Sequence, residues 1–432
     1  MKKPIGPLRV ESLVNGGTGI VRADGRVIFV PQVVPGDEII IRVRKEKKRY
    51  AEAELIEIVK PSAQRRVMPC PVAADCGGCQ WQQLPYADQL RWKQQLFHDT
   101  LIRQCSVDAG LLLPIVAAPD EWHYRSRVQI KCQLTSAGFI CGFFKPKSHF
   151  VVAMERCPVI AEPLNDLLGQ LRPLLGQSVF AGQIDQIDLS VGDCQRRRAV
   201  VHYQGADVVG LTELLLQIKA DEKLELLIQS GRSGRFIPVS GAGDLTINVD
   251  EPPLSLSYAA GGFAQINLAQ NRQLLKAVIA AANLTGSQRV LDLYCGMGNF
   301  SLPLARRARQ VCGVEDYSAS IEMARRNAVQ NQLENLLFYA QPAEGMLSLL
   351  AREEKFDLLL LDPPRAGAFT LMDELLAMPV PRVIYVSCDA QTLARDLKVI
   401  INGGYRLVSS EPFDMFPQTH HVESISVLEY CR

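Results

Sequence analysis

Short apolar runs separated by turn residues fill the first part of the chain. Residues 8–14, 19–23, 26–34, 37–45 and 51–59 are apolar or alternate between apolar and polar positions. The segments between them, such as NGGTG and VPGDE, consist of turn residues. Alternation with a period of two is typical of strands that bury one face. Residues 1–60 are therefore predicted to form a small, OB-like β-barrel of about five strands.

The pattern changes after residue 60. Residues 122–134, 137–145 and 149–156 predict strands, whereas residues 164–175 and 211–228 have the apolar spacing of helices. Strands and helices that do not alternate regularly are typical of α+β domains. Residues 61–262 are therefore predicted to form an α+β middle domain.

Helical and strand patterns alternate from residue 263 to residue 432. Strands are predicted at residues 289–294, 310–315, 336–340, 356–362 and 382–388, with helices between them and two more strands at the end. Such alternation predicts a mostly parallel, Rossmann-like α/β sheet. Sheets of this kind bind their ligands at the carboxyl ends of the strands. The fold class is thus a multidomain chain with a β-barrel, an α+β domain and an α/β domain.

Composition excludes several classes of protein. No apolar run approaches the ~18 residues that a membrane span needs, and the N-terminal segment lacks the apolar region of a signal peptide. Twelve cysteines in 432 residues are too few for a disulfide scaffold. We expect a reduced, cytoplasmic protein without a membrane partner, and a monomer with no obligate protein partner.

Basic residues are concentrated near the N-terminus. The net charge is +1, but residues 1–66 contain 14 Lys and Arg against 8 Asp and Glu. Six of the eight residues from Arg42 to Arg49 are basic. This run is either a solvated hairpin tip or a contact for the phosphates of an oligonucleotide, which small barrels often bind.

A glycine turn follows the first strand of the α/β domain, in the sequence VLDLYCGMGNF. Gly296 and Gly298 allow the backbone to approach a ligand closely. Glu315 ends the next strand, where nucleotide-binding sheets hold ribose hydroxyls. The third glycine of a dinucleotide site is absent, and Asp292 before the turn suits a cationic ligand such as S-adenosylmethionine. The pattern favours a methyltransferase over a dinucleotide enzyme or a sheet without cofactor.

Two further strands end in candidate catalytic residues. Asp362 is followed by two prolines, as in enzymes that methylate the exocyclic amines of bases. Cys388 ends the next strand and precedes a helix, whose N-terminus is expected to favour the thiolate. Cys388 is either a buried thiol or a nucleophile that opens on the same crevice as Asp362.

Methylation of a carbon would explain a nucleophilic cysteine. The C5 atom of uracil accepts a methyl group only after a thiolate has added to C6, and a base must then remove the C5 proton. Glu423, at the start of the last strand, is the preferred base, and its neighbours His420 and His421 are the alternatives.

Four cysteines have the spacing of a metal site. Cys70, Cys76 and Cys79 form a C-x5-C-x2-C set, and Cys157 is followed by proline as in ferredoxin-type runs. Zinc sites more often use two C-x2-C pairs, so an iron–sulfur cluster is favoured and zinc remains the alternative. The other cysteines outside the crevice have no ligand spacing and are predicted to be packing residues: Cys105, Cys132, Cys141, Cys194, Cys295, Cys312 and Cys431.

The combination of these motifs with GGFAQIN, LDPPRAG, VSCDAQTLARD and PQTHHVES resembles the bacterial RNA uracil-C5 methyltransferases, in particular the 23S ribosomal RNA type with an N-terminal TRAM barrel. The resemblance covers nearly the whole chain and implies 23S rRNA as the partner. It implies Cys388 as the nucleophile and Glu423 as the base. It also implies a [4Fe–4S] cluster on Cys70, Cys76, Cys79 and Cys157. The implied S-adenosylmethionine and target pocket consists of Gln265, Tyr294, Gly296, Asn299, Glu315 and Asp362.

Two positions depart from the family pattern. Asp389 stands where the family usually has Asn, and its charge is expected to oppose thiolate formation. Gln341 and Pro342 stand where an adenine contact is usual, which leaves the adenine site unassigned. The rival functions are the same chemistry on another rRNA uridine or on tRNA, amino-group methylation at Asp362, and an RNA-binding iron–sulfur protein without activity. Relatives that act on tRNA usually lack the barrel and the cysteine set, which disfavours tRNA.

Overall fold

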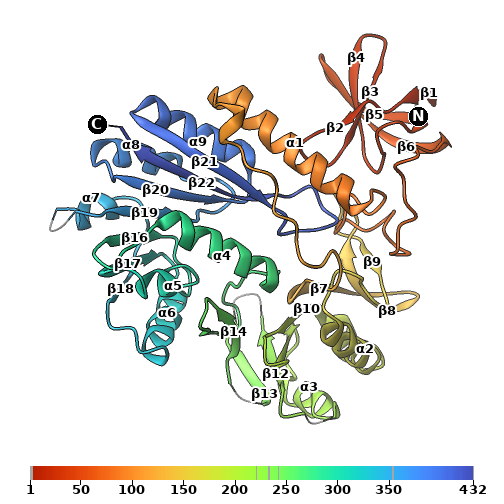
Figure 1. Ribbon diagram of the computed structural model, residues 1–432. Helices are drawn as coiled ribbons and strands as arrows, with labels where there is room; N and C mark the ends of the chain where they lie inside the picture. The colour runs from red at the N-terminus through yellow and green to blue at the C-terminus, as the bar shows by residue number, and fades with distance from the viewer. Residues whose placement is uncertain (1–2, 220, 232–233, 242, 353–354, 432) are drawn as a thin grey trace.

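The structure, a computed structural model, describes residues 3–219, 221–231, 234–241, 243–352 and 355–431. Figure 1 shows three parts: an N-terminal barrel at the upper right, a middle part in yellow and green below it, and a C-terminal part in cyan and blue at the left. The predicted fold class is confirmed by this arrangement. No helix in the described part of the chain is long and apolar enough to cross a membrane.

The barrel is a single six-stranded sheet in the order β1-β5-β6-β4-β3-β2. Its strands are β1 (Ile5–Arg9), β2 (Ser12–Leu13), β3 (Gly19–Ala23), β4 (Arg26–Val30), β5 (Glu38–Glu46) and β6 (Tyr50–Lys60). The first apolar run yields two strands where one was predicted. The break occurs because the Val10 amide donates to Asp37 O, whereas the Glu11 amide donates to Ile20 O on another strand.

The turn between β2 and β3 ties the barrel to the rest of the chain. Trp81, which is fully buried, donates its indole N–H to Gly17 O at 3.0 Å. Asn15 donates to the Thr100 hydroxyl at 3.1 Å. Leu13 and Trp81 belong to a small apolar cluster of their own. This turn is therefore fixed against the long helix α1 (Tyr86–Cys105).

The middle part contains a seven-stranded sheet in the order β13-β12-β11-β10-β7-β8-β9. Its strands are β7 (Arg127–Thr135), β8 (Gly138–Phe144), β9 (Val151–Ala153), β10 (Ile184–Val191), β11 (Arg197–Tyr203), β12 (Leu224–Ser230) and β13 (Phe236–Ser240). Helices α2 (Glu162–Gly176) and α3 (Val208–Leu215) and the short 3-10 turns η1 (Ala109–Leu111) and η2 (Ala181–Gln183) complete the elements between α1 and β12.

One predicted helix of this region is wrong. The apolar run 211–228 was expected to be a single helix, but it contains the end of α3 and most of strand β12. Asp221 accepts from the amides of Lys223 and Leu224 and starts a new element there. Leu224, Leu226 and Ile228 then alternate into the core beside β11. Residue 220 of the predicted helix lies outside the described residues.

The C-terminal sheet has the order β18-β17-β16-β19-β20-β22-β21, and among its described strands only β22 runs in the direction opposite to the others. The strands are β16 (Arg289–Leu293), β17 (Gln310–Glu315), β18 (Leu336–Ala340), β19 (Leu358–Leu361), β20 (Arg382–Ser387), β21 (Tyr405–Phe413) and β22 (Glu423–Tyr430). A separate hairpin, β14 (Leu245–Val249) and β15 (Leu254–Tyr258), precedes the sheet. The helices are α4 (Leu268–Ala282), α5 (Ser301–Ala305), α6 (Ser318–Gln330), α7 (Met346–Leu350), α8 (Phe369–Ala377) and α9 (Ala390–Asn402).

Both faces of this sheet are covered. Alternate strand residues such as Val290 and Leu360 pack with α4, α5 and α6. Their neighbours Leu291 and Leu361 face the opposite side, where α1, α8 and α9 pack. Because parallel strands buried on both faces leave only their ends accessible, the carboxyl edge is where this sheet can carry a site. Residues 353–354, in the helix predicted between the strands 336–340 and 356–362, lie outside the described residues.

Candidate active site

Predicted site residues lie side by side at the carboxyl edge of the C-terminal sheet. The strand register pairs Leu293 with Leu361 and Leu361 with Tyr385, so the glycine turn, Asp362 and Cys388 follow at adjacent strand ends. Ser387 pairs with Ser424 across the antiparallel pair β20–β22. This register places Glu423, which precedes Ser424, opposite Cys388, which follows Ser387.

The glycine turn needs its two glycines for different reasons. Tyr294, Gly296 and Gly298 all have positive φ, of 66°, 55° and 92°. A Cβ atom on Gly298 would lie 2.3 Å from Leu302 Cδ1 of α5, and the φ of 92° is one that residues with a side chain rarely adopt. A Cβ on Gly296 would meet nothing within 4 Å. Gly296 therefore faces open space, as a ligand-binding turn requires.

Glu315, at the end of β17, holds the turn in place. One carboxylate oxygen accepts from the Gly296 amide at 3.2 Å and the other accepts from the Tyr317 amide at 2.9 Å. Each oxygen keeps a second lone pair for a ligand hydroxyl. The proposed contact with a ribose is compatible with this geometry.

Of the remaining predicted pocket residues, Tyr294 and Asn299 belong to the glycine turn itself, whereas Gln265 belongs to another segment. Asn299 and Asn271 of α4 exchange two side-chain hydrogen bonds at 2.9 and 3.1 Å. Burial and the neighbouring Glu344 raise the pKa of Tyr294 to about 12. Gln265 is half-buried in the segment between β15 and α4. Asn267 in the same segment donates to Met415 O at 3.3 Å, which links it to the loop before Glu423.

Three carboxyl groups cluster beneath the glycine turn. Asp292 is fully buried, and burial, with Asp362 and Glu315 nearby, raises its pKa to about 8. Burial and the charge of Glu315 likewise raise the pKa of Asp362 to about 7. Ser301 donates to one oxygen of Asp292, whereas Oδ1 has no partner among the described residues. A cationic ligand such as S-adenosylmethionine would offset this unfavourable concentration of negative charge.

Proton release should therefore accompany donor binding. The positive charge of S-adenosylmethionine is expected to lower the pKa values of Asp292 and Asp362, so that affinity rises between roughly pH 6 and pH 8. Calorimetry at pH 7 in two buffers of different ionisation enthalpy measures the protons released. The Asp292→Asn variant should release fewer protons than the wild type. A binding enthalpy that does not depend on the buffer would contradict this electrostatic account.

Cys388 is half-buried, and its thiol is not activated in the free protein. Burial first, and then the charges of Glu423, Asp362 and Asp389, raise its pKa to about 11, while Arg365 opposes them. The expectation that the helix N-terminus favours the thiolate is thus wrong. The Asp389 carboxylate occupies that N-terminus itself, because it accepts from the amides of Gln391 and Thr392 at 2.9 and 3.0 Å.

Among the three candidate bases, Glu423 has the most suitable environment. It is buried, and burial together with Asp362 raises its pKa well above the usual range, which strengthens it as a proton acceptor. Burial and nearby positive charges lower the pKa values of His420 and His421 to about 4 and about 3. Both imidazoles are therefore neutral near pH 7 and weak as bases.

Cys388 opens into a cavity of about 290 Å³, and part of its wall comes from residues outside the sequence motifs. The barrel turn contributes Asn15 and Gly16 to its wall, and helix α1 contributes Lys93. Lys93 is fully buried and contacts Asp414 at 2.5 Å, which fixes the loop before Glu423. An asparagine–glycine pair is typical of an ordinary turn. The sequence alone therefore does not indicate that Asn15 and Gly16 line the cavity of Cys388.

The four predicted ligand cysteines line one small cavity. Cys70, Cys76 and Cys79 come from the loop before α1, and Cys157 follows β9. Burial raises the pKa of Cys79 to about 11 and that of Cys157 to about 12, and the other thiols contribute. As they stand, no three His, Cys, Asp or Glu side chains in the described ranges are placed to hold a metal ion. The shared cavity and the all-thiol donor set nevertheless fit a cluster.

Comparisons with known proteins agree with this geometry. Residues 86–430 match the family described as tRNA (uracil-5-)-methyltransferase, and residues 8–63 match the TRAM domain of tRNA (uracil(54)-C(5))-methyltransferase. Relatives named 23S rRNA (uracil(1939)-C(5))-methyltransferase are each 33% identical: that of Shewanella woodyi over 98% of this chain and 95% of its own length, and that of Vibrio cholerae over the same shares.

A solved structure, the Pyrococcus abyssi tRNA (uracil-54, C5)-methyltransferase in complex with S-adenosyl-L-homocysteine, has a TM-score of 0.74 and 26% identity. The match covers 98% of this chain and 100% of that one. The chain therefore belongs to the tRNA (uracil-5-)-methyltransferase family and is a S-adenosylmethionine-dependent RNA (uracil-C5) methyltransferase with an N-terminal TRAM domain.

Proposed function

We propose that this protein methylates C5 of uracil-1939 in 23S rRNA through a transient bond between Cys388 and C6 of the target base. The observation that supports the mechanism is the β20–β22 register, which sets Glu423 opposite Cys388. The choice of RNA follows the near-full-length relatives that carry this name. Because the thiol must reach a ring atom, the target base has to leave its stack.

Residues of the chain take part in two steps of the proposed reaction. Cys388 acts in the addition to C6, and Glu423 acts in the removal of the C5 proton. The Cys388 sulfur, once deprotonated, forms a bond to C6, and the electron pair of the C5=C6 bond moves toward C5 and the O4 carbonyl. C5 then takes the methyl group from the sulfonium, which becomes a neutral thioether. Glu423 accepts the C5 proton, the double bond re-forms and the S–C6 bond breaks. Positive charge bound near Asp362 would offset the carboxylates that raise the Cys388 pKa.

The alternative substrate is tRNA. The barrel and the cysteine set together were expected to disfavour it, but the matched TRAM domain carries the name of a tRNA enzyme, so the barrel alone does not separate the two substrates. Mass mapping of 23S rRNA and tRNA from a strain that lacks the gene separates the two. We expect one 5-methyluridine to disappear from 23S rRNA at the site named for the relatives. Its loss from tRNA instead would refute the rRNA assignment.

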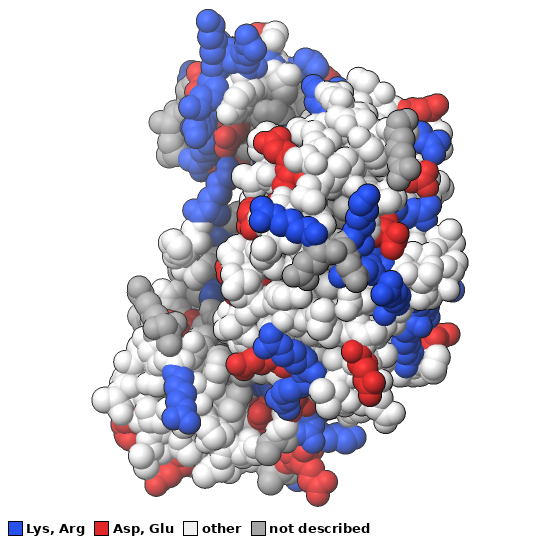
Figure 2. All heavy atoms as spheres, turned by 90° about the vertical axis from the view of Figure 1, so that its left-hand side faces the viewer, with Lys and Arg blue, Asp and Glu red and all other residues white. Residues whose placement is uncertain are grey.

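The barrel is the part of the chain suited to hold the RNA backbone. Arg44, Lys45, Lys47, Lys48 and Arg49 are all exposed around the β5–β6 turn. Figure 2 shows a lobe at the upper left in which blue side chains predominate, whereas both charges are interspersed below it. A concentration of this kind favours phosphate contacts over a merely solvated hairpin.

We also propose a [4Fe–4S] cluster on Cys70, Cys76, Cys79 and Cys157. A single zinc ion would hold four sulfurs about 2.3 Å from one point, and the described residues place no group of ligands in that way. When bound, the cluster would supply cross-links between the loop before α1 and the segment after β9. Asn165, which accepts from the Cys157 amide at 2.9 Å, already holds that segment to α2.

Removal of one ligand should therefore remove the cluster and loosen this region. Protein purified without oxygen is expected to contain about four irons and to absorb near 400 nm. The Cys79→Ser variant should lose the iron and unfold at a lower temperature, whereas Cys194→Ser, at an exposed cysteine, should change neither. Stoichiometric zinc without iron in the wild type would contradict the cluster.

A further inference from the structure

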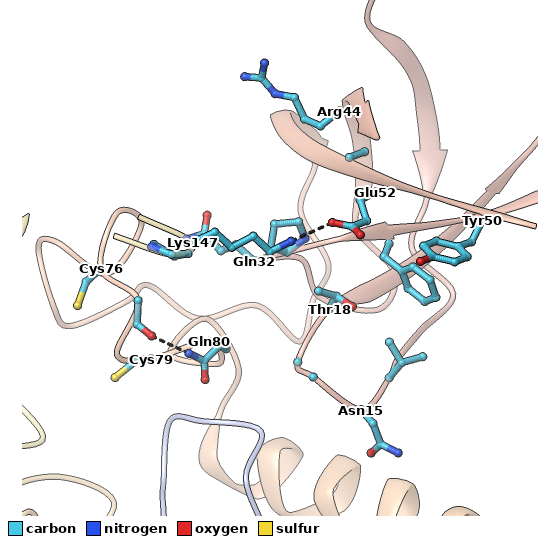
Figure 3. A pocket seen from close by; sticks show the side chains of 18 residues that line it. Asn15, Thr18, Gln32, Arg44, Tyr50, Glu52, Cys76, Cys79, Gln80 and Lys147 are labelled. Atoms are coloured by element: carbon cyan, nitrogen blue, oxygen red, sulfur yellow. Dashed lines mark hydrogen bonds and ion pairs between the residues drawn. The ribbon is translucent and has the colours of Figure 1, made fainter. Parts of the chain in front are cut away.

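A second cavity, of about 770 Å³, lies between the barrel and the cysteine loop. Its walls come from the barrel, from the loop that contains Cys76 and Cys79, and from the turn between β8 and β9. Figure 3 shows the lining side chains. A cavity of this size has room for a nucleotide. Neither Cys388 nor the glycine turn lines it, so the methyl-transfer chemistry does not account for it.

The barrel wall of this cavity offers an aromatic surface. Phe29 of β4 and Tyr50 of β6 both line it, with their ring centroids 5.6 Å apart and their planes at 63°. Tyr50 is 37% exposed, so part of its ring remains accessible for a further contact. Aromatic rings in a positively charged groove are typical binding surfaces for unpaired bases. Amide groups for a base edge are present on Gln32 and Gln80.

The cavity adjoins the pocket of Cys388. Asn15 and Gly16 line both, so the barrel turn is the shared wall between them. This wall is rigid because Gly17 is bonded to Trp81 and Asn15 to Thr100. A single strand that places one base beside Cys388 would cross this turn, and a neighbouring nucleotide would then reach the second cavity.

An ion pair spans the second cavity. Lys147, from the β8–β9 turn, extends toward Glu52 of β6, and the two side chains are 2.9 Å apart (Figure 3). The Lys147 side chain is 86% exposed, and exposed ion pairs of this kind are weak. A phosphate could therefore replace Glu52 as the partner of Lys147 at little cost. The charges of Lys45 and Lys47 also act on Glu52, so the surroundings favour an anion.

We propose that this cavity binds an unpaired nucleotide of the RNA substrate close to the target uridine, with its base against Tyr50 and its phosphate on Lys147 in exchange for Glu52. The proposal rests on the function proposed above, because it assumes that RNA enters the Cys388 pocket. If a neighbouring nucleotide binds between the barrel and the cysteine loop, this junction contributes to the selection of the RNA whose uridine reaches Cys388.

The exchange at Lys147 is tested with two variants of the holoprotein. If Glu52 competes with RNA, Lys147→Ala should weaken binding of a 23S rRNA fragment and reduce the salt slope by about 1. Glu52→Gln should tighten binding by a few-fold. Lys60→Ala is the matched control, since Lys60 pairs with Glu38 on the same barrel outside the cavity. Weaker binding by both Lys147→Ala and Glu52→Gln would mean that the pair only ties two segments together, and would overturn the exchange.

Stacking on Tyr50 is tested with a fluorescent base. 2-Aminopurine is placed in turn at each unpaired position near the target uridine of the same fragment. One position should be quenched by the wild type and by Tyr50→Phe but not by Tyr50→Ala, whose affinity should fall about tenfold. If no position shows quenching that depends on Tyr50, the nucleotide site is refuted.

Methylation of the unlabelled fragment by the wild type is measured in parallel. Methylation without Tyr50-dependent quenching refutes the nucleotide site alone. Absence of methylation refutes the proposed function, and with it the inference that depends on it.

Discussion

The Cys388→Ala variant should transfer methyl groups at least about 1,000-fold more slowly than the wild type, because without the sulfur C5 of uracil is not nucleophilic enough to attack a sulfonium. The substitution removes a half-buried thiol at a strand end, not a packed side chain in the core. Binding of S-adenosylmethionine, measured by calorimetry, and of RNA, measured by fluorescence anisotropy, should therefore persist. Transfer of labelled methyl to a 23S rRNA fragment gives the rate.

Cys194→Ala is the control for a generic effect of losing a thiol. Cys194 is exposed in the turn between β10 and β11 and lines neither the cavity of Cys388 nor that of the four cysteines, so full activity is expected. If Cys388→Ala keeps most of the activity, the covalent mechanism is excluded. Amino-group methylation at the Asp362-Pro363-Pro364 loop would then become the better explanation.

The Glu423→Gln variant should accumulate protein that is covalently joined to methylated RNA. Glutamine is isosteric but cannot accept the C5 proton, so methyl transfer proceeds and the S–C6 bond does not break. Denaturing gel electrophoresis should show a slowly migrating protein–RNA species, and turnover should fall by about 100-fold or more.

A glutamate on the same strand provides the matched control. Glu429 lies six residues further along β22 and pairs at the surface with Arg382 and Arg406. Glu429→Gln should therefore turn over normally and form no such species. Rapid turnover by Glu423→Gln would show that another group, such as a water-linked neighbour, removes the proton.

The sequence predicts the C-terminal sheet well because its strands are buried on both faces and its helices begin and end at clear signals. Strand β20 ends at Ser387, one residue before its predicted end, and α9 begins at Ala390 as predicted, with Asp389 as its N-cap. Ligand-facing residues of such sheets follow the strand ends. For that reason Asp362, Cys388 and Glu423 could be assigned to one edge before the structure was known.

Two elements were not predicted correctly, because residues far away in the chain determine their structure. Helix α1 buries Gln89 and Lys93 against the loop 414–418, so its apolar periodicity is weak in the sequence. The run 211–228 fits both a helix period and a strand period, and pairing with β11 decides the second half. Neither case can be resolved from local residues, because the partner is distant in the chain.

Electrostatic effects within the site were the least predictable. A helix N-terminus beside Cys388 was correctly located, but Asp389 occupies it. Burial and the carboxyl groups of Glu423 and Asp362 then outweigh the positive charge of Arg365. These contributions depend on side chains from three strand ends, which only the folded sheet brings together.

The most direct test of the account is a mechanism-based trap. The wild-type holoprotein is mixed with S-adenosylmethionine and a 23S rRNA fragment in which 5-fluorouridine replaces the target uridine. Fluorine at C5 cannot be removed as a proton, so the complex should persist as a stable adduct. Mass spectrometry of digested protein should find the methylated fluorinated nucleotide on the peptide that contains Cys388. An active preparation that yields no adduct, or an adduct on another residue, would contradict the central role of this thiol.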